Sequence, residues 1–249
     1  MKYFLQFFAL WPGHNNNFFF HFYALLSITS LIFQFYNVSD VFDNLELLSM
    51  NISNIIMILA IFLKTAISWR KRRYMKNVLI KMMDDWYQIK NPEQLIIMKN
   101  HVKFSHTFFV NAFIAYNFTI LLFPIFALRI YFTESVENRL LPLLAKFPFS
   151  NKTSPIYEII YILQAILLIF AGNAFVVLDT SYAAMILHAV SKLEIIRFEL
   201  ENFVNNILKS EKKSTVKVLF EKYHEVTKFV NRIDEIFSLQ LFFYFILAS

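Results

Sequence analysis

Long stretches without charged residues are the feature of this sequence that most restricts its fold. The segment from Phe18 to Tyr36 contains no charged residue, and the segment from Phe104 to Leu128 contains none either. A helix needs about 20 apolar residues to cross the hydrocarbon core of a bilayer. Four segments approach or exceed this length, at about 18–36, 47–69, 104–128 and 156–187. We therefore expect an all-α integral membrane protein.

The amino-acid composition supports helices over strands. Hydrophobic residues make up 57% of the 249 residues, which is more apolar surface than one soluble core can hide. Only six Pro and two Gly interrupt the apolar runs, whereas a membrane barrel needs short alternating strands. A fifth apolar segment, about 236–249, is too short for a crossing. We expect four full transmembrane helices and a partial fifth, in a single transmembrane domain (1–249) that is incomplete.

Loop charges predict the orientation in the membrane. The segment from Arg70 to Lys103 carries nine Lys or Arg, and the segment from His188 to Glu235 also carries nine. The segment 37–46 has none, and the segment 131–157 has three. Because cytoplasmic loops are enriched in Lys and Arg, we expect the N-terminus inside. The glycosylation sequons at Asn37 and Asn151 then lie in outer loops, where they are candidate sites.

The apolar pattern of the segment 188–235 predicts a cytoplasmic pair of amphipathic helices. Apolar residues recur at three-four spacing on both sides of the polar segment 209–214, which predicts two antiparallel helices. With no Gly or Pro between Ser181 and Leu208, the helix of the fourth span should continue unbroken to about Leu208. The apolar stripes either bury each other or contact other subunits and later helices. As subunit or anchor contacts we single out Asp179, Leu193, Ile196, Leu200, Phe203, Tyr223 and Val230.

Two of the charged features near the spans, Asp179 and the basic run after Trp69, have two interpretations each. Asp179 is either a polar contact that holds the fourth span against a neighbour or a residue already beyond the hydrocarbon. Lys64 lies close enough to the end of its span for its side chain to reach the interface. The basic run from Arg70 to Lys81 could attract anionic lipid or calmodulin, but a cluster that sets topology explains it without either partner.

Enzymatic chemistry has little support. The chain has no Cys and only two Gly, so thiolate sites and phosphate-binding glycine loops are excluded. His101 and His106 are five residues apart and do not share the helical face that a zinc protease motif requires. We expect no catalytic residues, no metal and no cofactor. The net charge of +6 comes from basic residues beside apolar spans, which indicates membrane topology and no nucleic-acid partner.

A small hydrophobic ligand is the remaining possibility. Apolar walls with a few hydrogen-bonding groups are typical of sites for such ligands, although inter-helix packing explains the same pattern. The candidates come from the outer halves of spans two, three and four. They are Asn51, Asn54, Ile55, Tyr116, Ile120, Phe123, Tyr161, Gln164, Ala165 and Leu168.

Several segments resemble the insect odorant receptor family over the whole chain. Leu10-Trp11-Pro12 is similar to the family's entry motif before the first span, and Ile233 to Leu241 is similar to its entry into helix five. The most specific match resembles the second outer loop and the start of helix four. It comprises Leu140-Leu141-Pro142, Phe147-Pro148-Phe149 and the segment 154–164.

The resemblance implies an odorant receptor subunit of seven helices with an inverted topology and a cytoplasmic N-terminus in the plasma membrane. Such subunits form the ligand-binding part of a heteromeric odorant-gated cation channel with a coreceptor, and the ligand is a small hydrophobic volatile. Family pockets lie among helices two, three, four and six, and helix seven lines the pore. This sequence lacks helices six and seven, so we expect a C-terminally incomplete chain. The alternatives are a gustatory receptor of the same superfamily, or a small multi-span transporter or membrane enzyme.

Overall fold

Helices form the secondary structure of the described chain, as the apolar segments predicted. The computed structural model describes residues 2–7, 11, 17–133, 139–205 and 212–248. Its helices are α1 (Lys2–Phe7), α2 (Phe18–Val41), α3 (Leu45–Arg70), α4 (Arg72–Gln88), α5 (Pro92–Thr133), α6 (Ile156–Asn205) and α7 (Lys212–Ala248). No strand occurs in these ranges, so the all-α fold class is confirmed.

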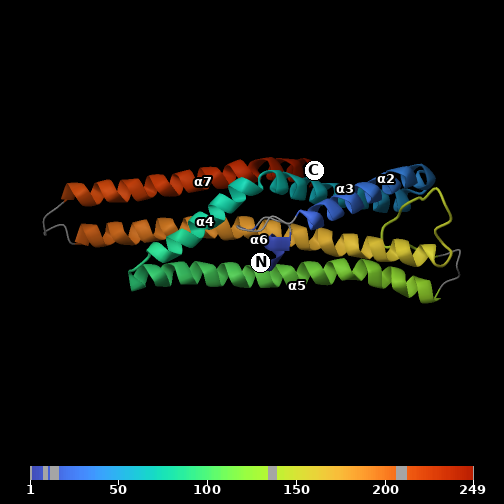
Figure 1. Ribbon diagram of the computed structural model, residues 1–249, viewed down its shortest axis with the longest axis horizontal. Coiled ribbons are helices and arrows are strands. Elements are labelled where there is room, and N and C mark those ends of the chain that lie inside the picture. Colours follow the sequence, from blue (N-terminus) through green and yellow to red (C-terminus); the bar gives the residue numbers. More distant parts are fainter. Residues whose placement is uncertain (1, 8–10, 12–16, 134–138, 206–211, 249) are drawn as a thin grey trace.

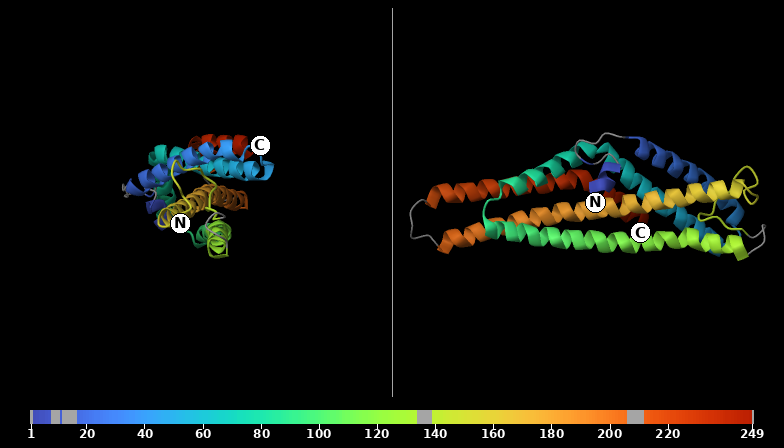
Figure 2. Two further views of the ribbon diagram at one scale, coloured as in Figure 1. Left: turned by 90° about the vertical axis from the view of Figure 1, so that its right-hand side faces the viewer. Right: turned by 60° about the horizontal axis from the view of Figure 1, so that its bottom comes forward.

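The molecule is elongated, with α5 and α6 running antiparallel along its whole length (Figure 1). Helices α2 and α3 pack on one half of α6, at the end where segment 139–155 joins it. Helices α4 and α7 pack on the other half of α6, and the two further views show the same division (Figure 2). We call these the α2–α3 half and the α4–α7 half.

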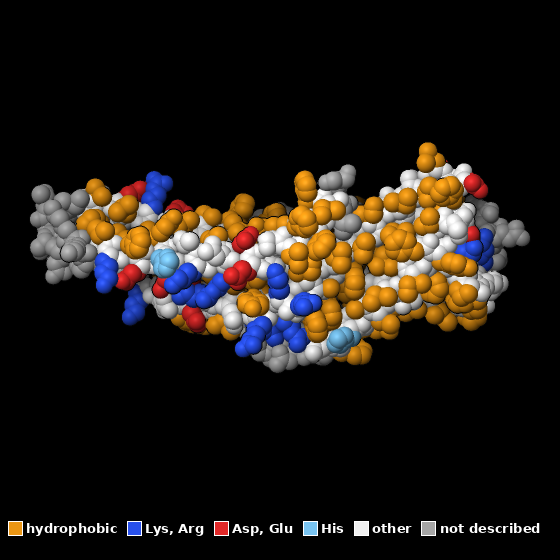
Figure 3. All heavy atoms as spheres, turned by 90° about the horizontal axis from the view of Figure 1, so that it is seen from above, with side chains coloured by type: hydrophobic (Ala, Val, Ile, Leu, Met, Phe, Trp, Pro, Cys, Tyr) orange, Lys and Arg blue, Asp and Glu red, His pale blue; other side chains and the backbone are white. Residues whose placement is uncertain are grey.

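Four helices are long and apolar enough to cross a membrane: Phe18–Val41, Leu45–Arg70, Pro92–Thr133 and Ile156–Val204. The partial fifth span expected at 236–249 coincides with the last part of α7. Hydrophobic side chains cover most of the visible face of the α2–α3 half, while charged side chains gather over the α4–α7 half and at the opposite tip (Figure 3). An apolar zone between two charged zones is the surface that a membrane-spanning bundle requires.

Side-chain caps fix the beginnings of two helices. The Asn44 side chain accepts hydrogen bonds from the backbone N–H groups of Glu46 (3.1 Å) and Leu47 (3.2 Å), which satisfies two free donors at the start of α3. Asn91 accepts from the N–H of Glu93 (2.9 Å), and Pro92 occupies the first position of α5, where no N–H is needed. The polar residues at the two sharp turns therefore decide where α3 and α5 start.

Each half has its own cluster of buried apolar residues. In the α2–α3 half, Tyr23, Ile58 and Leu167 are among the buried residues that join α2, α3 and α6. In the α4–α7 half, Met75 and Ile233 belong to a cluster that joins α4, α6 and α7. Helix α5 contributes few buried residues and faces its surroundings along most of its length.

Helix α6 runs without a break from Ile156 to Asn205, which confirms the predicted continuous helix between Leu187 and Leu200. Its expected end near Leu208 lies outside the described residues. One helix therefore continues from the spanning segment through residues 188–205, because no Gly or Pro occurs between Asn173 and Asn205.

Candidate functional site

A groove separates α3 from α5. Both helices pack on α6, yet within the described residues they make no more than marginal contact with each other. The space between them contains two cavities of about 580 and 770 Å³, which share Ser53 and Phe123 in their walls. We treat them as one site, the α3–α5 groove. Ligand pockets of about 300–1,000 Å³ are typical of sites for drug-sized molecules.

Both cavities of the groove have mainly apolar walls with a few polar side chains. We call the cavity beside Gly172 the deeper cavity and the one beside the segment before α6 the outer cavity. The deeper cavity is lined by Ser53, Ile56, Met57, Ala60, Ile61, Ala115, Tyr116, Thr119, Ile120, Phe123, Gly172 and Phe175. The outer cavity adds Asn54, Arg129 and the segment 140–144. Apolar contacts would therefore dominate the binding of a ligand. Hydroxyl groups in both cavities, and an amide and a guanidinium group in the outer cavity, could orient it.

A glycine shapes the floor of the groove. A Cβ added to Gly172 would lie 1.7 Å from Cδ1 of Ile120, so the α6 backbone meets the α5 side chain directly. Any larger residue at position 172 would force the Ile120 side chain to move. Because both residues line the deeper cavity, this contact helps to set its width.

An ion pair lies beneath the groove. Lys64 on α3 donates to the Asp179 carboxylate on α6. The Lys64 ammonium also lies 4.4 Å from the centre of the Phe175 ring, which lines the groove. Only 8% of Lys64 is exposed, and its ammonium is paired within the bundle. The Asp179 carboxylate thus compensates a lysine charge that is buried inside a spanning helix.

Four of the predicted ligand residues line the groove. Tyr116, Ile120 and Phe123 follow each other on one face of α5, and Asn54 faces them from α3. The Tyr116 ring lies 5.0 Å from that of Phe175, so an aromatic pair forms part of the wall.

The other predicted ligand residues join structural elements. Asn51 donates to the Gln34 carbonyl of α2 (3.1 Å), and the Tyr161 hydroxyl donates to the Pro124 carbonyl of α5 (2.8 Å). The Gln164 amide donates to the Leu143 carbonyl (3.1 Å) and accepts from its N–H (2.9 Å). Ile55 and Leu168 lie in the apolar cluster of the α2–α3 half, and Ala165 is half-buried on α6.

Sequence reasoning missed several groove residues. Ser53, Met57 and Ala60 continue the α3 face that Asn54 begins, and their three-four spacing was the available signal. Gly172 and Phe175 carried no such signal, because their role depends on the approach of α5 to α6. Among the described residues, no cluster of three His, Cys, Asp or Glu could hold a metal ion.

A buried charge cluster connects α4 to α6 in the α4–α7 half. The Asp85 carboxylate accepts from Nε2 of His188 (2.9 Å) and from Nζ of Lys192 (2.8 Å), and Lys81 lies 3.3 Å away. Lys81 in turn lies 3.7 Å from Glu225 of α7. Burial alone would raise the pKa of Asp85, but the hydrogen bonds from His188 and Lys192 and the nearby lysine charges lower it to about 2.

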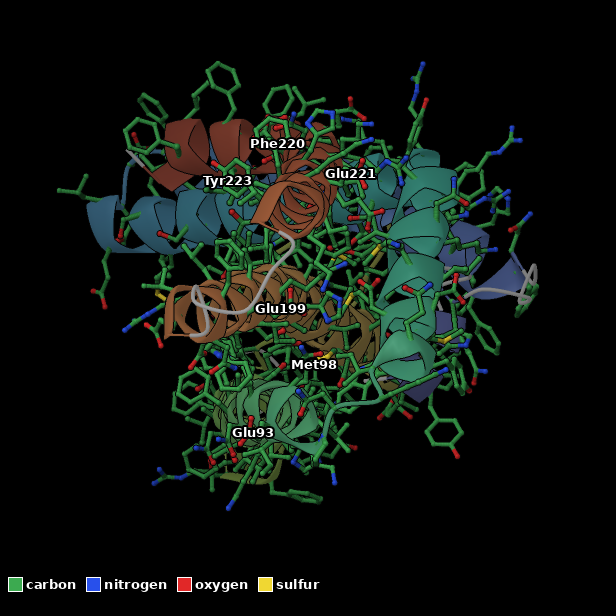
Figure 4. The ribbon with its side chains drawn as sticks, turned by 90° about the vertical axis from the view of Figure 1, so that its left-hand side faces the viewer. Glu93, Met98, Glu199, Phe220, Glu221 and Tyr223 are labelled. Carbon is green, nitrogen blue, oxygen red and sulfur yellow. The ribbon has the colours of Figure 1, made fainter. Side chains whose placement is uncertain are left out.

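A second polar contact joins α5, α6 and α7 at the tip of that half. Glu199 of α6 accepts from Nε2 of Gln94 (2.8 Å) and from Nζ of Lys222 (2.6 Å). Figure 4 views the molecule from this end, and α6 lies between α7 and α5. The three helices are therefore held together where the cytoplasmic pair was predicted.

The predicted anchor residues divide between the surface and the helix contacts of the α4–α7 half. Leu193, Leu200, Tyr223 and Val230 are exposed on α6 and α7. Ile196 and Phe203 are half-buried, the former against the apolar cluster. Asp179 lies apart from these residues, at the ion pair under the groove. The buried α7 stripe instead contains Leu219, Val226 and Ile233.

The sequon residues lie at the opposite end. Asn37 is in the last turns of α2, and Asn151 is in the segment that precedes α6. Both are half-exposed, at the end where α2 meets α3.

Comparison with known proteins relates the chain to chemosensory receptors. A family model described as 7tm Odorant receptor matches residues 44–249. The structure of the insect olfactory receptor OR5 from Machilis hrabei is 13% identical, with a TM-score of 0.77 over 99% of this chain and 66% of that one. The same receptor in complex with eugenol gives a TM-score of 0.82, again at 13% identity, over 99% and 68%. A search of curated proteins by sequence finds no match.

At this identity the structural likeness shows the fold. The chain spans about two thirds of the length of the receptor structures that it matches.

Proposed function

Because the chain belongs to the insect odorant receptor family, we propose that it binds a small hydrophobic volatile in the α3–α5 groove. The observation that carries this proposal is the groove itself, which has mainly apolar and aromatic walls with a few polar side chains, among them Tyr116, Thr119 and Asn54. Eugenol, the ligand of the related receptor structure, is a small aromatic molecule of this class. Its single ring would fit between Tyr116, Phe123 and Phe175.

Filling the groove should abolish most of this binding. Ser53 lies in the walls of both cavities, so the change Ser53→Phe places a ring where they meet. We expect an affinity loss of at least about tenfold, or about 1.4 kcal/mol. The measurement is displacement of the fluorescent probe 1-aminoanthracene by eugenol from the purified chain in lipid nanodiscs.

The matched control is Thr29→Phe, the same kind of enlargement on α2, at a residue that lines neither cavity of the groove. It should leave displacement unchanged. Equal binding by wild type and Ser53→Phe would contradict the proposed site, as would an equal loss in both variants.

We further propose that the chain acts in a heteromeric odorant-gated cation channel with the odorant coreceptor. The exposed residues Leu193, Leu200, Tyr223 and Val230 support this, because they leave apolar surface uncovered on the α4–α7 half. A contact with other subunits would cover this surface. The odorant-binding chain would then contribute the ligand site.

The proposed location is the plasma membrane, with the N-terminus and the α4–α7 half in the cytoplasm. The support is the concentration of Lys and Arg in that half (Figure 3). In intact cells we expect an antibody to reach a tag inserted after Asn151 but not a tag at the N-terminus. We also expect Asn151→Gln to remove a glycan that a mass shift reports. An N-terminal tag that is stained without permeabilisation would show the opposite orientation.

A further inference from the structure

A cavity separate from the α3–α5 groove lies between α2, α6 and the segment 145–149. Its volume is about 320 Å³, and its walls include Leu26, Phe33, Phe147, Ile159, Leu163 and Leu167. It shares no lining residue with the α3–α5 groove. The molecule therefore has room for a second ligand, independent of the proposed odorant.

The walls of this cavity offer little hydrogen bonding. Ser30 and Gln164 are two of its three polar lining residues, and both are already engaged. The Ser30 hydroxyl accepts from Nε2 of Gln34 (2.7 Å), and the Gln164 amide is bonded on both sides to the backbone of Leu143. A ligand here gains apolar contact and little else, which favours a hydrocarbon chain over a volatile with a polar group.

Exposed residues of α6 form part of the cavity wall. Ile159 is 55% exposed and Leu163 is 40% exposed, and both belong to the spanning part of α6. Acyl chains of the bilayer surround such residues. In a bilayer that α6 crosses, acyl chains would therefore contact this part of the cavity wall.

Two opposite charges lie at the end of the cavity that segment 145–149 closes. The backbone N–H of Lys146 donates to the Phe33 carbonyl (3.1 Å), which fixes this residue beside the cavity wall. Its ammonium lies 2.5 Å from the Asp40 carboxylate and 5.0 Å from the centre of the Tyr36 ring. The ion pair is partly exposed to solvent. A lysine and a carboxylate side by side complement the adjacent phosphate and ammonium of a zwitterionic headgroup.

We propose that this cavity holds one acyl chain of a zwitterionic phospholipid, with its phosphate on Lys146 and its ammonium on Asp40. The apolar walls select the chain, and the charge pair selects the headgroup. The lipid would tie the segment before α6 to α2 on the side of the bundle away from the α3–α5 groove residues.

Photolabelling in nanodiscs tests the proposal. The chain is reconstituted in phosphatidylcholine with a trace of phosphatidylcholine carrying a diazirine on one acyl chain, irradiated and mapped by peptide mass spectrometry. We expect labelling of segments 26–33 and 156–167 to exceed that around Leu121, an exposed lipid-facing residue of α5. Thr29→Phe, which fills the cavity, should lower this labelling by about fivefold, or about 1 kcal/mol. Ser53→Phe should leave it unchanged.

Further variants distinguish a folding defect, binding of the headgroup and binding of the volatile at this cavity. Ala145→Phe fills the same cavity from the other wall, so a loss in either well-folded variant supports the site. Lys146→Glu should lower labelling by the phosphatidylcholine probe but not by a diacylglycerol with the same chain. Labelling equal to that around Leu121, or unchanged in both filling variants, would overturn the proposal. Displacement of the lipid label by eugenol would also overturn it, because the cavity would then be a site for the volatile.

Discussion

Replacing Asp179 by leucine is expected to lower the free energy of unfolding by about 3–5 kcal/mol, because the change leaves the buried Lys64 charge without its carboxylate. Only 8% of Lys64 is exposed, and it lies in a helix long and apolar enough to cross a membrane, so little solvent can replace the lost partner. The measurement is a denaturant titration of the purified chain in mixed micelles.

The double variant Lys64→Met/Asp179→Leu should recover most of the loss, to within about 1 kcal/mol of wild type, because two apolar side chains of similar size replace the pair. Arg197→Met is the matched control. Arg197 pairs with Glu201 on the exposed surface of α6, and such pairs contribute at most about 1 kcal/mol. If Asp179→Leu lowers the free energy of unfolding no more than Arg197→Met does, the ion pair does not stabilise the packing of α3 on α6.

Replacing Asp85 by alanine should destabilise the α4–α7 half by a similar amount, about 3–5 kcal/mol. The change leaves His188 and Lys192 without the carboxylate that accepts from both. Because α4 is joined to α6 through this cluster, hydrogen exchange in residues 72–88 should accelerate more than exchange in α2. Uniform acceleration over the whole chain would show that Asp85 does not fasten α4 in particular.

The same carboxylate predicts a dependence of stability on pH. The pKa of Asp85 is lowered from 3.8 to about 2 in the folded chain. Its stabilising effect is therefore complete above pH 3.8 and is lost as the pH falls toward 2. Linkage gives a loss of about 2 kcal/mol over this window. Asp85→Asn should remove that part of the acid sensitivity, and identical acid titrations of wild type and Asp85→Asn would contradict the assignment.

The spans and the continuous α6 could be predicted from the sequence because they depend on local properties. Hydropathy over about 20 residues defines a crossing, and the lack of Gly and Pro after Ser181 keeps one helix intact. The groove-facing side of α5 could also be predicted, since Tyr116, Ile120 and Phe123 recur at helical spacing. These features require no knowledge of which helices are neighbours.

Pairings between distant segments could not be predicted in this way. Lys64 and Asp179 are 115 positions apart, and only the packing of α3 on α6 brings them together. Tyr161 and Gln164 looked like ligand residues, yet their polar atoms bind the backbone of α5 and of the segment before α6. In α7, the apolar stripe is wide, and the sequence does not show that Leu219 and Val226 are buried while Tyr223 is exposed.

Protection of a single thiol tests the central proposal, that the α3–α5 groove binds the ligand. The chain has no Cys, so Ser53→Cys introduces its sole thiol at the junction of the two cavities. We expect saturating eugenol to slow alkylation of this thiol by a small uncharged maleimide at least about tenfold, as a bound ligand of moderate affinity requires. Thr29→Cys, outside the groove, should react at the same rate with and without eugenol. Equal rates for Ser53→Cys in both conditions, or equal slowing of both thiols, would contradict the account.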